Sequence, residues 1–167
     1  DLGTINEGEL LIGVDTPYPP FEIGQPPDIT GFDIEIMGAI ADDIGLEPSY
    51  QDTGFDTIFR DTANGQFDTA AAATTITPER QQKVNFTDPY YEATQALVVA
   101  EDNSDIVTTA DLGGKIVGAQ DGTTGETLAN DETDASEVRP FPEGTDAFSS
   151  LVNGQIIAFD PLSDRLR

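Results

Sequence analysis

The sequence has 167 residues, and its 32 acidic and 7 basic residues give a formal net charge of -25. Partners with a phosphate surface, such as nucleic acids and anionic membranes, need a basic face, so this charge excludes them. Cys and His are both absent, which excludes thiol and imidazole catalysis, disulfides and zinc fingers. We therefore predict no metal site and no cofactor. The length suits one ordinary domain or two small lobes.

The charge also indicates the surroundings in which the protein works. Asp outnumbers Glu, and the only lysines are Lys83 and Lys115. Repulsion among so many carboxylates destabilises a compact chain at low salt, and molar salt screens it because the Debye length falls to about 3 Å. This pattern predicts a halophilic protein, and an acidic protein from a low-salt source is the alternative.

The first part of the chain alternates strand and helix patterns. Glu9 to Val14 is an apolar run that predicts a buried strand, and the proline-rich stretch 16–20 predicts a loop after it. Apolar residues at helical spacing predict a helix from about Phe32 that stops at Gly45. The next predicted elements are a strand at 48–53, a helix from Phe55 to about Asn64, a small-residue strand at 68–75, a short helix with Thr77 as N-cap and Pro78 in its first turn, and a strand at 96–100.

The same rhythm resumes after the polar turn 101–105, which could end one lobe and open the next. Strands are predicted at 115–119, 138–141 and 156–159, and helices at 122–129 and 145–152. Such alternation favours parallel sheets with helices on their faces. The sequence predicts no transmembrane span and no signal peptide, so we expect any export signal to lie outside it.

Two features suggest an anion site. The stretch from Gly118 to Gly125 follows a strand and opens a helix, but its glycines fit neither the dinucleotide fingerprint nor a Walker loop. It is either a helix N-terminus that binds an anion or a plain turn. Arg80 lies near a second helix start, and a guanidinium can bind a carboxylate through two parallel hydrogen bonds, with the Thr75 hydroxyl and backbone N–H groups completing the cradle. Alone, such an arginine equally fits a surface ion pair.

Other candidate residues have both a functional and a structural interpretation. Tyr18 and Phe55 could form apolar walls around a ligand, although Phe55 fits core packing at least as well. Asp15 and Asp160 each follow a predicted strand, where open parallel sheets place ligand-binding groups, but either could cap a turn. Carboxylates are too numerous for any pair to indicate catalysis, and without His a Ser-His-Asp arrangement is impossible.

Several motifs in this order resemble one known family, the polar amino-acid binding proteins of ABC importers. They are Val14-Asp15-Thr16-Pro17-Tyr18-Pro19-Pro20-Phe21-Glu22, Gly31-Phe32-Asp33-Ile34-Glu35, Thr75-Ile76-Thr77-Pro78-Glu79-Arg80, Phe86-Thr87-Asp88-Pro89-Tyr90-Tyr91, Asp111-Leu112-Gly113-Gly114-Lys115, and Gly122-Thr123-Thr124. The resemblance implies an α/β, two-lobed type 2 periplasmic-binding-protein fold that closes on its ligand. We expect lobe 1 at residues 1–98, lobe 2 at 99–160, and a tail or the start of a return crossover at 161–167.

The resemblance also implies roles for individual residues. Arg80 would pair with the ligand α-carboxylate, with help from Thr75 and from backbone groups at Ala73 and Thr124. Tyr18 and Phe55 would hold the aliphatic part of the ligand between them. The remaining ligand-binding residues implied are Asp15 and Gln120 near the ligand side chain, Thr123 beside Thr124, and Asp160 at the α-ammonium group.

Two departures from the family pattern affect these expectations. The register after Gln155 is unusual, so Asp164 competes with Asp160 for the ammonium. The family's chain also returns to lobe 1, whereas this sequence stops at Arg167, so the fold is expected to be truncated before that return. If the sequence is complete, lobe 1 would expose apolar surface that dimerisation or segment exchange could cover.

The function implied is capture of a polar amino acid outside the cell and its delivery to an ABC permease by hinge closure. The protein would be extracellular or periplasmic, anchored at the cell surface, and not an enzyme. Two alternatives share the fold: a cyclohexadienyl-dehydratase-like enzyme, for which no acid can be nominated, and a ligand-sensing receptor ectodomain.

Overall fold

The computed structural model describes residues 3–160, with side chains up to residue 157. Its contacts divide the chain into two compact units, of which the first ends at Asp88 and the second begins at Pro89. We predicted the boundary after residue 98, so it lies earlier than expected. The reason is strand β6 (Ala96–Val98), which pairs with β9 (Ile157–Asp160) in the second unit. The polar turn at 101–105 therefore lies inside the second unit.

The first unit is built on a three-stranded parallel sheet in the order β4-β1-β5. Its strands are β1 (Glu9–Val14), β4 (Glu47–Asp52) and β5 (Thr69–Ala70), and its helices are α1 (Phe32–Ile44), α2 (Phe55–Ala63) and α3 (Pro78–Gln81). A separate antiparallel hairpin joins β2 (Ile23–Gln25) to β3 (Asp28–Thr30). Strand β5 is much shorter than the predicted strand at 68–75, because the chain leaves the sheet before Ala73, which adopts a left-handed φ of 43°.

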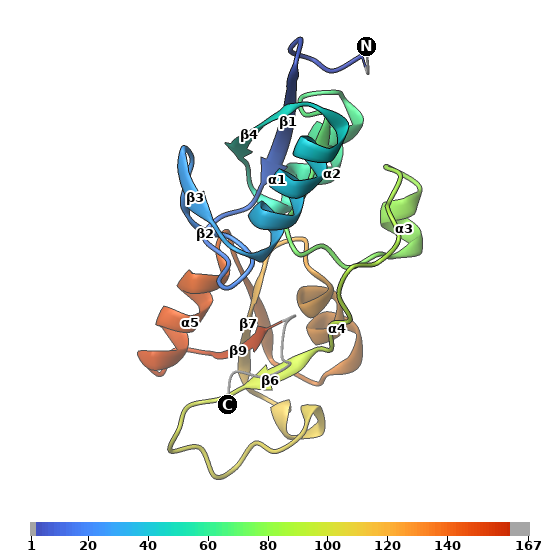
Figure 1. Ribbon diagram of the computed structural model, residues 1–167. Coiled ribbons are helices and arrows are strands. Elements are labelled where there is room, and N and C mark those ends of the chain that lie inside the picture. The colour runs from blue at the N-terminus through green and yellow to red at the C-terminus, as the bar shows by residue number, and fades with distance from the viewer. Residues whose placement is uncertain (1–2, 161–167) are drawn as a thin grey trace. The chain divides into compact units, whose positions relative to one another are not determined.

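The sheet of the first unit is covered on both faces because its side chains alternate. Ile12 of β1 packs in one cluster with Ile34 and Ala41 of α1, which lies alongside β1 in Figure 1. On the opposite face, Ala72 packs with Ile58 of α2 in a second cluster. On an extended chain, successive side chains point to opposite faces. The small residues that follow β5 therefore pack alternately against the α1 side and the α2 side of the sheet.

The second unit has a four-stranded sheet in the order β6-β9-β7-β8. Strands β7 (Ile116–Gln120) and β8 (Glu137–Phe141) are parallel, and β9 is parallel to β7, whereas β6 runs antiparallel to β9. The sheet is thus mixed rather than wholly parallel. Its helices are η1 (Thr109–Leu112), a short 3₁₀ turn, α4 (Thr124–Glu132) and α5 (Gly144–Val152).

Helices α4 and α5 lie on opposite sides of β7 (Figure 1). Val117 of β7 packs with Ala129 of α4, while its neighbour Ile116 packs against Ala147 and Leu151 of α5. Both units therefore place a helix on each face of a sheet, and the loops that follow the strands carry the candidate site residues.

None of the helices among residues 3–160 has the length and apolar character that crossing a bilayer demands.

Candidate functional site

Arg80 occupies a short helix whose start matches the sequence prediction. Thr77 is the N-cap of α3, and its hydroxyl accepts a hydrogen bond from the Arg80 backbone N–H at 3.3 Å. Pro78 follows as the first helical residue, where its missing N–H costs nothing. The Arg80 side chain is only 7% exposed, and its Nη1 donates to the Thr75 carbonyl oxygen at 2.7 Å. Arg80 is therefore a buried cation, not a surface one, and a backbone carbonyl oxygen holds its guanidinium.

Two aromatic rings flank the guanidinium. The Cζ atom of Arg80 lies 5.2 Å from the centre of the Phe55 ring and 4.8 Å from that of Phe59. The two rings meet edge to face, with their centres 5.9 Å apart. Burial lowers the pKa of Arg80 to about 10, although the charge of Glu79 acts in the opposite direction. A guanidinium shielded from water in this way is stabilised when an anionic group supplies hydrogen-bond acceptors.

The segment from Ala73 to Thr75 connects this arginine to α1. The backbone N–H of Ala73 donates to Asp33 Oδ2 at 2.7 Å, and Thr75 holds Arg80 through its carbonyl oxygen. Four predicted site residues, namely Phe55, Ala73, Thr75 and Arg80, are thus brought together in one group. Thr75 itself is exposed, which leaves its hydroxyl accessible to a ligand.

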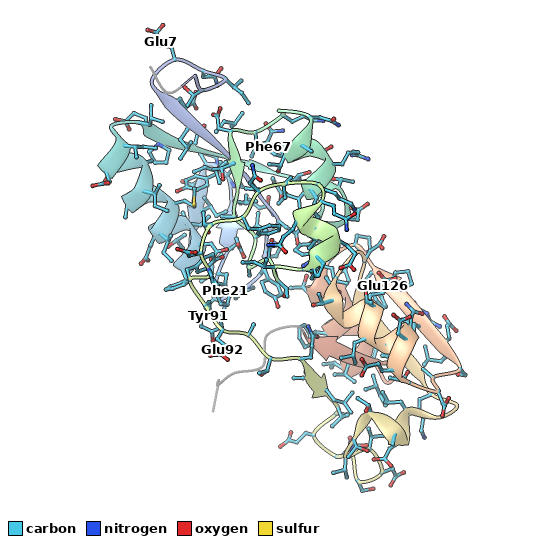
Figure 2. All side chains as sticks on the ribbon, turned by 90° about the vertical axis from the view of Figure 1, so that its right-hand side faces the viewer. Glu7, Phe21, Phe67, Tyr91, Glu92 and Glu126 are labelled. Atoms are coloured by element: carbon cyan, nitrogen blue, oxygen red, sulfur yellow. The ribbon has the colours of Figure 1, made fainter. Side chains whose placement is uncertain are left out.

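Asp15 and Tyr18 follow β1 in the same unit. Asp15 comes directly after the strand and is 4% exposed. Tyr18 is half-buried, its backbone N–H donates to the Glu22 carbonyl oxygen at 2.8 Å, and its ring stacks on Phe21, which Figure 2 labels, with centres 6.4 Å apart. Asp15 therefore lies at the carboxyl end of a parallel strand, as predicted, and Tyr18 lies in the loop that follows that strand.

The second unit carries a polar group at the start of α4. Thr123 is the N-cap and is 4% exposed; its hydroxyl donates to the Gln120 carbonyl oxygen at 2.7 Å and accepts from the Glu126 N–H at 3.2 Å. Gln120, the last residue of β7, donates through Nε2 to the Pro142 carbonyl oxygen at 3.1 Å. Glu126 (Figure 2) also reaches back with Oε2 to accept from the Gly122 N–H at 2.9 Å. Two backbone N–H groups at this helix start, those of Gly122 and Glu126, therefore have side-chain acceptors within the chain.

Thr124 has a partner that the sequence did not reveal. Its hydroxyl accepts a hydrogen bond of 2.7 Å from Gln95 Nε2. Asp160 is the last residue of β9, and its backbone pairs with Ala96 of β6, while Asp164 lies outside the described residues. The structure thus collects Gln120, Thr123 and Thr124 at one strand-to-helix junction of the second unit.

The bacterial extracellular solute-binding proteins, family 3, match this chain over residues 10–160, which is most of its length. The chain belongs to this family.

Among relatives of this family 3 protein is the ABC transporter arginine-binding protein 1 of Escherichia coli, 34% identical over 149 residues that cover 89% of this chain and 60% of the relative. An ancestral arginine-binding protein bound to arginine superposes with a TM-score of 0.86 at 34% identity, covering 92% of this chain and 70% of that one. The ancestral amino acid-binding protein AncCDT-1, a precursor of cyclohexadienyl dehydratase, gives a TM-score of 0.87 at 34% identity, covering 92% and 70%.

These comparisons confirm the predicted family and the type 2 periplasmic-binding-protein fold. The E. coli relative and the two ancestral proteins are each named as a binding protein. The chain spans about 60% of the length of the E. coli relative. The roles assigned to individual site residues stay predictions.

Sequence reasoning gave no role to Phe59 and Asp33, which support the group around Arg80, or to Gln95, which contacts Thr124 in the second unit. Asp33 did leave a signal, because it lies on the same helical stripe as Met37 and Ala41, the side of α1 that faces the core. An acidic residue on a core-facing stripe indicates a buried partner. Phe59 and Gln95 left no such signal, since the contacts that matter here, from Phe59 to Arg80 and from Gln95 to Thr124, join residues distant in sequence.

Proposed function

We propose that this family 3 protein captures a polar amino acid outside the cell by hinge closure and delivers it to an ABC permease in the membrane. L-Arginine is the first ligand to test, because the E. coli relative and the ancestral protein are both named for arginine. The family description places its members outside the bacterial cytoplasm, and we extend this to attachment at the cell surface.

The observation that carries the proposal is the buried guanidinium of Arg80. All free amino acids share an α-carboxylate, and a carboxylate is the group that a planar guanidinium binds best. Phe55 and Phe59 keep water away from the cation, which strengthens its attraction for an anion. Arg80 would then bind the α-carboxylate, the Thr75 hydroxyl would donate to it, and the ring of Phe55 would contact the aliphatic part of the ligand.

The remaining predicted residues would recognise the rest of the amino acid. Asp15, buried at the end of β1, suits a ligand with hydrogen-bond donors on its side chain, such as arginine, lysine or glutamine. In the second unit, the backbone at Thr124 and the amide of Gln120 would contribute further contacts, and Asp160 would bind the ammonium group.

The decisive experiment is calorimetric titration of L-arginine into the protein in molar salt, repeated with the variants Arg80→Ala and Arg80→Lys. Loss of one partner of a buried charge pair costs about 2–5 kcal/mol, so Arg80→Ala should weaken binding at least about 30-fold. Lysine keeps the charge but lacks the planar fork, so an intermediate loss is expected for Arg80→Lys.

Arg60→Ala is the matched control, because the Arg60 side chain is 66% exposed on the same unit and pairs only with its neighbour Asp61 in the contacts described for it. It should bind L-arginine as the wild type does. Unchanged affinity in Arg80→Ala would overturn the site. If L-arginine gives no heat of binding, thermal shifts with the other amino acids should identify the ligand. Turnover of a cyclohexadienyl acid would instead favour the enzyme alternative that AncCDT-1 suggests.

A further inference from the structure

Three carboxyl groups are buried together in the first unit, next to the segment that holds Arg80. They belong to Glu22, which is fully buried, to Asp33, which is 1% exposed, and to Asp15, which is 4% exposed. Among the described residues, no group of three or more acidic side chains is arranged to hold a metal ion. Their proximity in the interior therefore needs another explanation, since neighbouring carboxylates repel one another strongly away from water.

The backbone forces Glu22 and Asp33 together. The N–H groups of Phe32 and Asp33 donate to the carbonyl oxygens of Pro20 and Phe21, both at 3.1 Å, so the loop lies directly against the start of α1. Gly31 makes this approach feasible: its φ is 128°, and any side chain there would collide with the Phe21 carbonyl oxygen. The residue after Phe21 is thereby fixed beside the first turn of the helix.

The two carboxyl groups differ in the donors available to them. Asp33 Oδ2 accepts a hydrogen bond from the Ala73 N–H at 2.7 Å. Neither carboxyl oxygen of Glu22 receives a hydrogen bond from a donor among the described residues. A charged Glu22 would be a buried anion beside another anion, whereas a protonated Glu22 donates a hydrogen bond to Asp33. Burial first, then this hydrogen bond, then the charges of Asp33 and Asp15, raise the pKa of Glu22 to about 11.

We propose that Glu22 and Asp33 form a carboxylic acid–carboxylate pair in which Glu22 keeps the proton at neutral pH, and that this pair positions Ala73 for ligand binding. Ala73 has a left-handed φ of 43°, a conformation that an alanine adopts only at a cost. The hydrogen bond from its N–H to Asp33 holds that conformation. Glu22 acts through Asp33, so both are positioning residues.

The ligand-binding part of this inference rests on the proposed function, because Ala73 and Thr75 are predicted ligand contacts. The proton on Glu22 and the restraint on Ala73 do not, and both can be measured without a ligand. The charged groups that act on Glu22 are Asp33 from α1 and Asp15 from the end of β1, and both favour the protonated form.

The first test compares the wild type with Glu22→Gln in urea unfolding as a function of pH in molar salt. An unfolded glutamate releases its proton above its ordinary pKa of 4.5, while the folded one retains it up to about 11. Stability from this group is thus complete below pH 4.5 and is lost as the pH rises. The unfolding equilibrium constant of the wild type relative to Glu22→Gln should rise about tenfold per pH unit between about pH 6 and 9.

Carbon-13 NMR of the wild type, labelled at the glutamate δ-carbons, gives the same information without a variant. One glutamate resonance should remain at the protonated position at pH 7. An equal pH dependence for the two proteins, or a spectrum in which every glutamate is ionised at pH 7, would overturn the proposal.

The second test uses two variants of similar volume. Glu22→Gln can still donate to Asp33, whereas Glu22→Met cannot. Hydrogen exchange of the Ala73 amide should stay slow in the first and become several-fold faster in the second. The affinity for L-arginine should stay within about twofold in Glu22→Gln and fall about fivefold in Glu22→Met.

The readouts separate the two hypotheses. If the wild type binds none of the amino acids but Ala73 exchange responds as described, the proposed function fails and the positioning role stands. If exchange and affinity are the same in both variants, Glu22 only fills space, and the positioning role fails.

Discussion

The guanidinium carbon of Arg80 lies 4.8 Å from the centre of the Phe59 ring, and this ring also meets Phe55 and Phe86, with centre distances of 5.9 and 6.4 Å. Phe59 is therefore the aromatic centre that supports the predicted carboxylate-binding cation. Replacing Phe59 by an aliphatic residue of similar size removes the aromatic ring but keeps the apolar bulk. Such a variant tests whether the ring electrons help to hold the arginine in position.

Phe59→Leu should weaken L-arginine binding about 2- to 5-fold, because a cation–π contact of this kind contributes about 0.5–1 kcal/mol. Calorimetric titration measures the change. Phe86→Leu is the matched control, since that ring contacts Phe59 and has no described contact with Arg80; it should leave affinity unchanged. Equal losses in the two variants would show that packing, and not the ring electrons, supports the arginine.

Local signals predicted much of the fold correctly. The apolar run at Glu9–Val14 is β1, Gly45 ends α1 in a left-handed conformation, and Thr77 caps α3. Each depends on a residue type with one strong local preference, such as the conformational freedom of glycine or the hydroxyl of an N-cap threonine. Elements of this kind can be predicted from the local sequence, without knowledge of the residues that pack against them.

The missed features depend on contacts between distant residues. The strand predicted at 68–75 ends early because Ala73 adopts a left-handed conformation, in which its backbone N–H donates to Asp33, forty residues away in sequence. Nothing in the sequence around Ala73 indicates this contact. Gln95 meets Thr124 for a similar reason. The unit boundary was misplaced because β6 pairs with the last described strand, and the sequence does not state which strands pair.

Thr123 should contribute to the stability of the second unit through its cap. Thr123→Ala removes the acceptor of the Glu126 N–H and the donor to the Gln120 carbonyl, so the free energy of unfolding should fall by about 1–2 kcal/mol. Urea unfolding in molar salt measures it. Thr123→Ser keeps the hydroxyl and should lose far less; an equal loss would assign the effect to the methyl group.

The carboxylate of Asp111 should stabilise the second unit only when it is charged. The backbone N–H groups of Val107 and Thr108 donate to its Oδ2 at 3.0 and 2.9 Å, and they hold the pKa of Asp111 below its ordinary value of 3.8. Its stabilisation is therefore present above that value and is lost as the pH falls through the lower, folded value. Asp111→Asn should be less stable than the wild type at pH 6, and the difference should close in acid. A difference that persists there would contradict this account.

The net charge of -25 predicts that the protein is halophilic. The melting temperature should rise steeply from low salt to about 1 M KCl, where the Debye length is near 3 Å, and then more slowly. Calorimetry at constant pH measures this. KCl and NaCl should act alike, because screening depends on ionic strength and not on the cation; a flat profile would favour the low-salt alternative.

Glycine at position 118 of β7 should be required for full stability, because no space exists there for a side chain. A Cβ atom would collide with Ile156 Cδ1 and come within 3.0 Å of the Phe141 ring. Gly118→Ala should therefore lower the free energy of unfolding by about 1–3 kcal/mol through overpacking. Ile156→Val removes the Cδ1 atom that the new methyl group would meet, so the double variant should be more stable than the sum of the two single losses predicts. Urea unfolding of all four proteins gives the coupling energy. Strict additivity would mean that the alanine is accommodated by backbone movement instead, and that Ile156 does not limit the space at this strand.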